Sequence, residues 1–387
     1  MSQAVLFAND TLAAADTPDA PGFEIGWDHA RYRLVPPAEQ LHAGNPVRQG
    51  WQAGQAVFGH RTLRPSTAVR QWLQLRLSAW LRGQSFEALQ VTPNFLAQLE
   101  VARCPVTREP LTQGTGQPTD AVVERVFHGA GIAAGNLVTL SARAAAAKAH
   151  CGWDDALGFA HQIECGHVER IAGLDAAEWR RLAVLMSLAT PLKHAQVAAL
   201  PLLVLPPNRL RVLNPVQALQ TLLTLLFTRP AYARNMADLA AVMPSSAARQ
   251  TYQVFMHTLL ARRVAAGPMA DGPALRRAME EAWQHPLVQR RWQRLALSLS
   301  MGECEHIVQY AGRRKLAGDS WQWLSRAAAT EGWALESQGR IEEAAVTIAT
   351  PVQHPLRTQP HKALRNVRFT RQSPSSACVP AANGATP

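Results

Sequence analysis

The sequence predicts a mainly α-helical, multi-helical protein that carries one small embedded module of two strands and a helix and has disordered ends. Three observations predict this fold class. Hydrophobic residues make up 47% of the 387 residues, so most of the chain can bury a core. Alanine and leucine dominate while β-branched residues are few, and this composition favours helix. After Trp153, most segments repeat their apolar residues at helical spacing.

Composition divides the chain into four regions. Residues 1–22 are interpreted as a disordered leader, 23–150 as an N-terminal region, 151–346 as an α-helical domain and 347–387 as a basic disordered tail. Within the second region, residues 23–57 mix glycine, proline and scattered aromatic residues, which predicts short strands or loops. The tail has basic residues but no acidic one from position 351 onward, so it can attract phosphate without sequence preference.

Helices are predicted where apolar spacing coincides with capping signals. The first begins at Ser66 and ends at Gly83, and Arg70, Arg76 and Arg82 lie off its apolar stripe. Further helices are expected over Phe95–Val101, Leu137–His150, Ala176–Leu188, Pro215–Phe227, Met236–Val242, Ala247–Val264, Pro273–Glu281, Leu287–Ser300, Ile307–Arg314 and Trp321–Glu336. No clean internal repeat accompanies them.

The charge balance predicts a polyanionic partner. The formal net charge is +11 and the pI is about 10.2, and nucleic acid is the usual polyanion for such a protein. An arginine-rich composition without a specific partner is the alternative explanation. No signal peptide is evident and the longest apolar runs are too short to cross a bilayer, so no membrane partner is expected. Five cysteines without a C-x-x-C pair argue against a disulfide framework and favour the cytoplasm.

The segment from Cys104 to Lys148 carries the strongest functional signal. It contains Cys104-Pro-Val-Thr-Arg-Glu-Pro-Leu111, Val123-Glu-Arg-Val126, Gly131-Ile-Ala-Ala-Gly-Asn-Leu137 and Ser141-Ala-Arg-Ala-Ala-Ala-Ala-Lys148. A hairpin is expected over the first of these and a strand over Val122–Phe127. The order and spacing resemble the HNH, or ββα-metal, family, whose members hold one divalent metal against the scissile phosphate.

The resemblance to the family is close in the Gly-Asn turn and weaker at the positions that bind the metal in the family. Gly131, Gly135 and Asn136 match the family's Gly-Asn turn, in which the asparagine ties the loop to the strand. Glu124 takes the place of the metal-binding aspartate. Cys104 fits the opening hairpin, but the partner cysteines of zinc-stabilised members are absent, so it cannot form a zinc site alone.

The residues that would perform catalysis depart from the family pattern. Arg125 stands at the position of the general base, and Ala145 stands where a metal-binding asparagine is expected. His128 lies one residue from a useful place and could serve as the base. The resemblance therefore implies a module that has lost most of its ligands.

Three hypotheses about function follow. The preferred one is a nucleic-acid-associated binding protein with a catalytically degenerate module and no cofactor, in which Arg125, Arg143 and Lys148 contact phosphate. The first alternative is a nuclease that depends on a divalent metal such as Mg²⁺ and uses Glu124, His128 and the turn asparagine. The second is a protein-interaction scaffold whose C-terminal helices bind a protein partner.

Other patterns have structural explanations beside functional ones. Residues 129–135 contain a Gly-x-Gly pattern that could cradle a pyrophosphate, but strands and helices do not alternate around it. Possible zinc ligands are His150, Cys151, His161, Cys165 and His167. The alternative is that these cysteines are buried in the core and these histidines lie on the surface, without binding a metal. Arg70, Arg76, Arg82 and the basic run at 313–315 could contact phosphate, although charge runs are usually a solvated face. Trp72, Trp80, Trp321 and Trp323 could stack on bases, although aromatic residues at helical spacing more often belong to the core.

Overall fold

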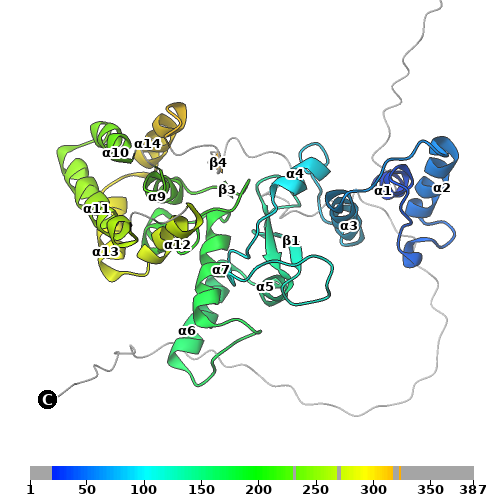
Figure 1. Ribbon diagram of the computed structural model, residues 1–387, viewed down its shortest axis with the longest axis horizontal. Coiled ribbons are helices and arrows are strands. Elements are labelled where there is room, and N and C mark those ends of the chain that lie inside the picture. The colour runs from blue at the N-terminus through cyan, green and yellow to red at the C-terminus, as the bar shows by residue number, and fades with distance from the viewer. Residues whose placement is uncertain (1–19, 230–231, 268–271, 317–321, 324–387) are drawn as a thin grey trace, which may run out of the picture.

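The computed structural model describes residues 20–229, 232–267, 272–316 and 322–323, and these are mainly helical (Figure 1). The helices are α1 (Ala20–Arg31), α2 (Pro46–Phe58), α3 (Thr67–Leu81), α4 (Pro93–Gln98), α5 (Ala142–Lys148), α6 (Trp153–Cys165), α7 (Ala176–Leu188), α8 (His194–Ala199), α9 (Pro215–Leu226), α10 (Tyr232–Ala241), α11 (Ser246–Ala265), α12 (Gly272–Ala282), α13 (Pro286–Leu297) and α14 (Met301–Arg313), with a short 3-10 helix η1 (Ala38–Gln40). The strands are β1 (Ala121–Arg125), β2 (Leu137–Ser141), β3 (Arg211–Val212) and β4 (Gln322–Trp323). The predicted fold class is confirmed.

Residues 23–57 form most of a tight helical hairpin, α1 and α2, where the sequence predicted short strands or loops. That prediction was wrong because it treated the glycines as breakers of regular structure. A Cβ added at Gly26 would lie 1.9 Å from the carbonyl oxygen of Val47, and one added at Gly50 would lie 1.9 Å from that of Phe23. Glycine at these points lets the two backbones approach more closely than any side chain permits.

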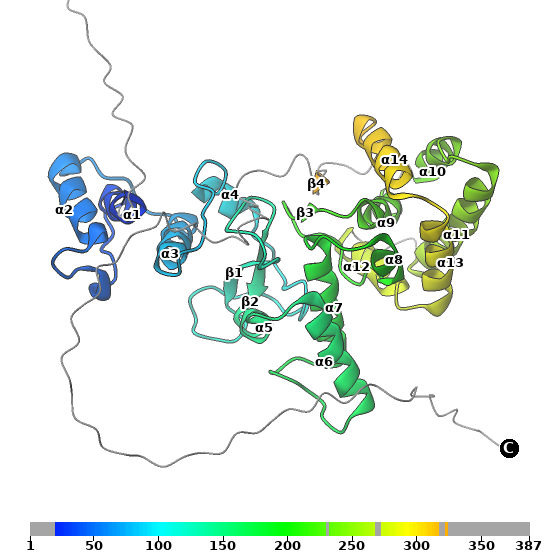
Figure 2. The ribbon, with the colours of Figure 1, turned by 180° about the vertical axis from the view of Figure 1, so that it is seen from behind.

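Helix α3 confirms the first predicted helix and joins the hairpin to the rest of the chain. The Ser66 hydroxyl caps it by accepting a hydrogen bond from Val69 N at 3.2 Å. Arg76 is buried and donates to Asp28 at 2.5 Å and to Glu24 at 3.1 Å, both in α1. Its charge is therefore used inside the fold. Figure 2 shows α3 between the α1–α2 hairpin and the strands, as Figure 1 does from the other side.

The module consists of an antiparallel pair of strands followed by a helix. The register of β1 and β2 sets Glu124 opposite Val138, and α5 follows β2 directly. The helix predicted over Leu137–His150 was wrong for its first five residues, which form β2. This stretch includes the β-branched Val138 and Thr139 and is buried throughout, and a short apolar run of that kind fits a strand as well as a helix. Ser141 then caps α5.

One hydrophobic core continues from the module into the C-terminal helices. Its buried members run from Cys104 to Leu316, and Trp179, Trp283 and Trp292 are among its largest side chains. The boundary expected at residue 150 therefore separates two compositions but does not separate two cores. A smaller cluster packs α3 and α4 against the module, and another packs α3 against α1 and α2.

Helices α7, α9, α11, α12 and α13 follow their predicted ranges closely, whereas α10 begins four residues earlier than predicted and no range was predicted for α6 or α8. Helix α14 begins at Met301, earlier than predicted, because Ser300 and Glu303 form a capping box. The helix predicted over Trp321–Glu336 lies mostly outside the described residues, and its described part is β4. That strand pairs in parallel with β3, so the prediction was wrong for Gln322–Trp323.

Both ends of the chain lie outside the described residues. Residues 1–19 hold most of the predicted leader, and residues 324–387 include the whole predicted tail. Helix α1 begins at Ala20, so the last residues of the predicted leader are helical. Within the described ranges, every helix is too short or too polar to cross a lipid bilayer.

Candidate nucleic-acid interface

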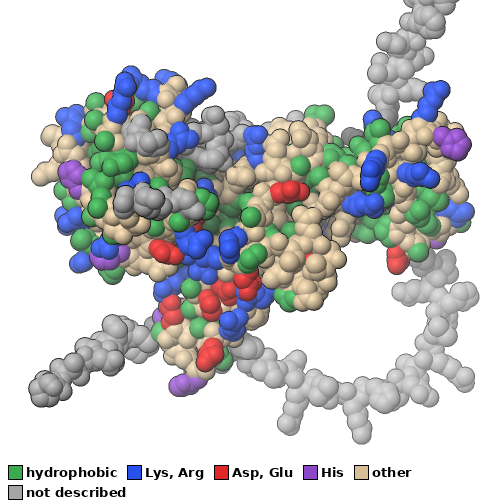
Figure 3. Space-filling model, in the orientation of Figure 1, with side chains coloured by type: hydrophobic (Ala, Val, Ile, Leu, Met, Phe, Trp, Pro, Cys, Tyr) green, Lys and Arg blue, Asp and Glu red, His purple; other side chains and the backbone are tan. Residues whose placement is uncertain are grey.

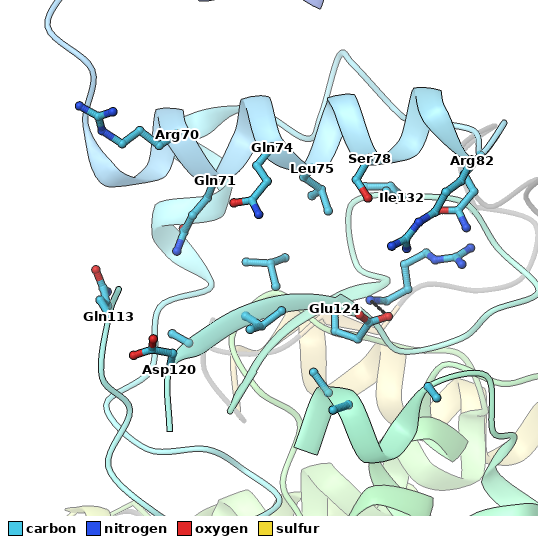
Figure 4. A pocket seen from close by; sticks show the side chains of 18 of the residues that line it. Arg70, Gln71, Gln74, Leu75, Ser78, Arg82, Gln113, Asp120, Glu124 and Ile132 are labelled. Atoms are coloured by element: carbon cyan, nitrogen blue, oxygen red, sulfur yellow. Dashed lines mark hydrogen bonds between the residues drawn. The ribbon is translucent and has the colours of Figure 1, made fainter. Parts of the chain in front are cut away.

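A groove of about 1140 Å³ lies between α3 and the module (Figure 4). One wall is a face of α3, from which Gln71, Gln74, Leu75 and Ser78 point into the groove. The opposite wall is β1 along its whole length, with Ala145 and Ala146 of α5 beside it. The groove therefore follows a helix on one side and a strand on the other.

Three arginines line this groove. Arg70 lies near the start of α3, Arg82 directly follows its end, and Arg125 is the last residue of β1. Arg70 and Arg82 are exposed, and neither forms a salt bridge with a residue that the structure describes. Burial lowers the pKa of Arg125, and the like charge of Arg82 adds to the effect. Neighbouring cations of this kind attract an anion.

Of the two carboxylates that line the groove among the described residues, one accepts hydrogen bonds from the loop that precedes it. Asp120 accepts hydrogen bonds of 2.7 Å from the hydroxyls of Thr115 and Thr112 and from Gly116 N. Those bonds, with Thr115 contributing most, lower the pKa of Asp120 to about 2. The carboxylate therefore stabilises the loop that precedes β1. The other carboxylate belongs to Glu124.

Glu124 and His128, which the resemblance relates to metal binding and to the base, lie together around a lysine. Nζ of Lys148 is 2.6 Å from Nε2 of His128 and 3.7 Å from Oε1 of Glu124. Lys148 ends α5, and only 1% of its side chain is exposed. The ammonium thus fills the space between the two residues and supplies a fixed positive charge there.

The charges around this lysine determine the state of the histidine. Burial lowers the pKa of His128 to about 4, and the charges of Lys148 and Arg125 add to the effect. The imidazole is therefore neutral at pH 7, and its Nε2 can accept a hydrogen bond from the ammonium. Burial also lowers the pKa of Lys148 to about 8, although Glu124 opposes this shift. Lys148 still carries its proton at neutral pH.

This donor set does not fit a divalent metal. Ala145 lines the groove at the position where the resemblance expects a third ligand, and alanine cannot coordinate. Across the described ranges, no three His, Cys, Asp or Glu side chains gather closely enough to hold a metal. Of the possible zinc ligands, His161 and Cys165 do meet, with 3.7 Å between Nδ1 and Sγ, but on the exposed surface of α6. Zinc sites need three or four ligands.

The Gly-Asn turn holds the loop between β1 and β2. Oδ1 of the fully buried Asn136 accepts from Phe127 N at 2.8 Å, and its Nδ2 donates to the carbonyls of Phe127 and Gly131 at 2.9 Å. Gly135 has a φ of +89°, and a Cβ there would meet the Arg211 side chain at 2.1 Å, so only glycine fits. The loop between β1 and β2 that Asn136 holds in place carries His128.

Arg143, predicted to contact phosphate, lies in an ion-pair network outside the groove. Its Nη2 is 2.9 Å from carboxylate oxygens of both Glu109 and Glu178. Arg108 of the same hairpin turn reaches Glu281 of α12 at 2.9 Å. We call these five residues the clamp. Figure 3 shows basic and acidic side chains gathered over α7 and its junction with α12.

The hairpin predicted over Cys104–Leu111 is present as a turn closed by one antiparallel bridge between Arg103 and Pro110, and it is anchored to the module. Cys104 N donates to Glu109 O, and Arg108 N donates to Cys104 O. The buried Sγ accepts hydrogen bonds from Ser141 N at 3.4 Å and from its hydroxyl at 3.5 Å. The thiol therefore ties the turn to the start of α5.

Sequence reasoning offered Arg70, Arg76 and Arg82 as possible phosphate contacts but did not place α3 beside the module. Arg70 and Arg82 line the groove, whereas Arg76 is buried in ion pairs. Trp72, considered for base stacking, instead donates to Val91 O at 2.8 Å and lies 4.6 Å beneath the Arg76 guanidinium. Polar residues at three- and four-residue spacing on α3 were a weaker indication that one face of this helix lines a site.

No protein-family model, no curated protein and no solved structure matches the chain. A functional interpretation therefore depends on the geometry of the groove and of the lysine beneath it.

Proposed function

We propose that this protein binds nucleic acid through the groove between α3 and the module, without metal-dependent cleavage. The observation that carries the proposal is the set of arginines that line the groove, of which Arg70 and Arg82 are exposed and form no salt bridge with a described residue. The buried ammonium of Lys148, which does not line the groove, occupies the space between Glu124 and His128 that a metal would take. It cannot lower the pKa of a bound water or stabilise a leaving oxygen in the way that a divalent metal does.

The arginines of the groove support binding through phosphate charge. Arg70 and Arg82 are twelve positions apart along α3, which corresponds to about 18 Å at the helical rise. Arg125, at the end of β1, also lines the groove, with its Nη1 donating to the Ala130 carbonyl at 3.0 Å. Cations spaced in this way can contact several phosphates of one bound chain and release their counterions.

Binding measured across a salt series tests the proposal. We expect affinity for nucleic acid at low salt that falls linearly with the logarithm of salt concentration. The double variant Arg70→Gln/Arg82→Gln should weaken binding and reduce that slope by roughly 1.5, because each lost phosphate contact removes about 0.7–0.9. A matched control is Arg277→Gln/Arg290→Gln, which removes two exposed charges outside the groove. Absence of binding by the unmodified protein at low salt would refute the proposal.

Two further measurements address the alternatives. A nuclease would cut plasmid in Mg²⁺ or Mn²⁺, and Glu124→Ala and His128→Ala would each abolish the cutting; we expect no cutting by the unmodified protein. Co-purification of a protein partner without nucleic acid would favour the scaffold of C-terminal helices.

A further inference from the structure

The groove is long and narrow. The fifteen residues of α3 form a wall of about 22 Å, and the five residues of β1 form one of about 17 Å. A volume of about 1140 Å³ for the centres of water molecules over this length corresponds to a channel roughly 11–12 Å across once a water radius is added on each side, similar to the major groove of a double helix at about 12 Å. One nucleic-acid strand can enter such a channel, whereas a duplex is wider than its own major groove.

Contacts between the α3 region and the module limit how far the channel can widen. The segment after α3 bonds to the loop of the module, with Ile132 N donating to Ser85 O at 2.8 Å and Glu87 N donating to Ile132 O at 2.9 Å. A buried apolar cluster also packs α3 and α4 against the module. Moving α3 away from the module to admit a duplex would break these backbone bonds and expose this cluster.

Several groups in the channel lack a hydrogen-bond partner among the described residues. The side-chain amides of Gln71 and Gln74 project into it from α3. Hydrogen bonds at both ends of the strand pair show that the even-numbered residues of β1 bond to β2. The N–H and C=O of Val123 therefore point away from β2, at the edge of β1, and Val123 is one of the residues that line the channel. Such donors and acceptors suit the edges of unpaired bases, which in a duplex are occupied by the partner strand.

We infer that the channel binds single-stranded nucleic acid in preference to duplex. Phosphates lie toward Arg70 and Arg82, and base edges lie toward Gln74 and Val123. This inference rests on the proposed function and specifies its substrate class. Among the residues that the structure describes, no Phe, Tyr or Trp lines the channel, so we expect recognition to depend on hydrogen bonds and charge, with little contribution from stacking.

An extended peptide suits the channel less well. A peptide added to the edge of β1 would need successive outward N–H groups. The N–H of Ala121 already donates to Thr112 O, and that of Arg125 to the Glu124 carboxylate. Only Val123 is left to pair with an added strand.

Fluorescence anisotropy tests the inference. The probe is a labelled strand of about 16 nucleotides, as DNA and as RNA, used alone and annealed to its complement. At equal salt concentration we expect the single strand to bind about tenfold tighter than the duplex, because only the strand fits between the walls.

Val123→Pro is the sharpest variant. It removes the outward N–H and leaves the ladder with β2 intact, since proline is tolerated where the N–H of an edge strand faces outward. We expect it to weaken single-strand binding about fivefold, the usual effect of one hydrogen bond. The matched control Val123→Ala keeps the N–H and should bind like the unmodified protein. Gln74→Leu, at an exposed helical position, is a second variant should the proline disturb the strand.

The outcomes separate the inference from the proposed function. Duplex binding as tight as single-strand binding, with both variants unaffected, would overturn the inference and leave the proposed function in place. Failure of both nucleic-acid forms to bind at low salt would remove the proposed function as well. Tight binding of an acidic peptide, weakened by Val123→Pro while neither nucleic acid binds, would reassign the channel to a peptide.

Discussion

Arginines on the two sides of the module are used differently. In the clamp, Arg143 bridges Glu109 and Glu178 with two contacts of 2.9 Å, and only 6% of the Glu178 side chain is exposed. In the groove, Arg70 and Arg82 are exposed and form no salt bridge with any described residue. The same residue type serves folding on one side and is free for a partner on the other. A buried carboxylate nearby, and not closeness to the motif, distinguishes the two roles.

Lys148 combines features of both sides. It is as buried as a clamp residue, but its nearest neighbour is a neutral histidine rather than a second carboxylate. Its pKa is lowered to about 8 by burial. For Arg143 burial acts in the same direction, yet bonds to Glu109 and Glu178 outweigh it and raise the pKa. A buried cation that is only partly satisfied is typical of functional sites.

The largest expected effect is loss of the clamp. Arg143→Met leaves the buried Glu178 carboxylate without its arginine and should lower the free energy of unfolding by about 3 kcal/mol. Urea denaturation measures this change. Arg82→Met, which removes the same charge from the groove, should stay within about 0.5 kcal/mol of the unmodified protein. Equal stability of the two variants would remove the distinction between the two sides.

Lys148→Met should have a smaller effect that depends on pH. The folded state releases the lysine proton near pH 8, whereas the unfolded chain keeps it to about pH 10.5, so the free energy of unfolding rises with pH in this window. We expect a rise of about 1 kcal/mol between pH 8 and 9 in the unmodified protein and no such rise in Lys148→Met. Denaturation curves at a series of pH values measure it. Identical curves for the two proteins would mean that the ammonium is not buried as described.

Much of the helical fold could be predicted from local signals. Ser66 before an apolar stripe and Pro215 at the first turn of another marked helix starts that the structure confirms, because such signals depend on neighbours in sequence. The N-terminal hairpin could not be predicted in this way. Gly26 and Gly50 are tolerated in helices only because the partner backbone lies against them, and that contact is tertiary.

The hydrogen bonds of the Gly-Asn turn could be predicted from the sequence, but the contacts that surround the site could not. Asn136 bonds to the loop as the Gly-Asn pattern implied, since these partners are close in sequence. Arg143 is paired because Glu178 lies beside it, and Arg82 lines the groove because α3 lies beside the module. Both arrangements bring together residues that are far apart along the chain. The lysine was predicted to contact phosphate, but its burial beneath His128 could not be inferred without coordinates.

His128→Gln should change stability on the acidic side. The unfolded chain binds a proton at this histidine below about pH 6.5, whereas the folded state resists it down to about pH 4. The free energy of unfolding therefore rises with pH between these values, and the variant should lose part of that rise. The effect is smaller than that of the lysine because the imidazole is half-buried and screened. His161→Gln, at an exposed position on α6, is the matched control in the same denaturation series.

The smallest effects should come from single charges of the groove. Arg82→Gln removes one exposed guanidinium beside Arg125, so stability should change little while nucleic-acid affinity at low salt falls about two- to fourfold. Arg70→Gln, at the other end of α3, should cause a similar loss, and anisotropy titrations at two salt concentrations measure both. High salt should abolish the difference between variants and unmodified protein, because it removes the counterion term that each arginine contributes. A loss that persisted at high salt would show that these arginines recognise bases or shape the groove, and the contrast between a folding side and a binding side would then need revision.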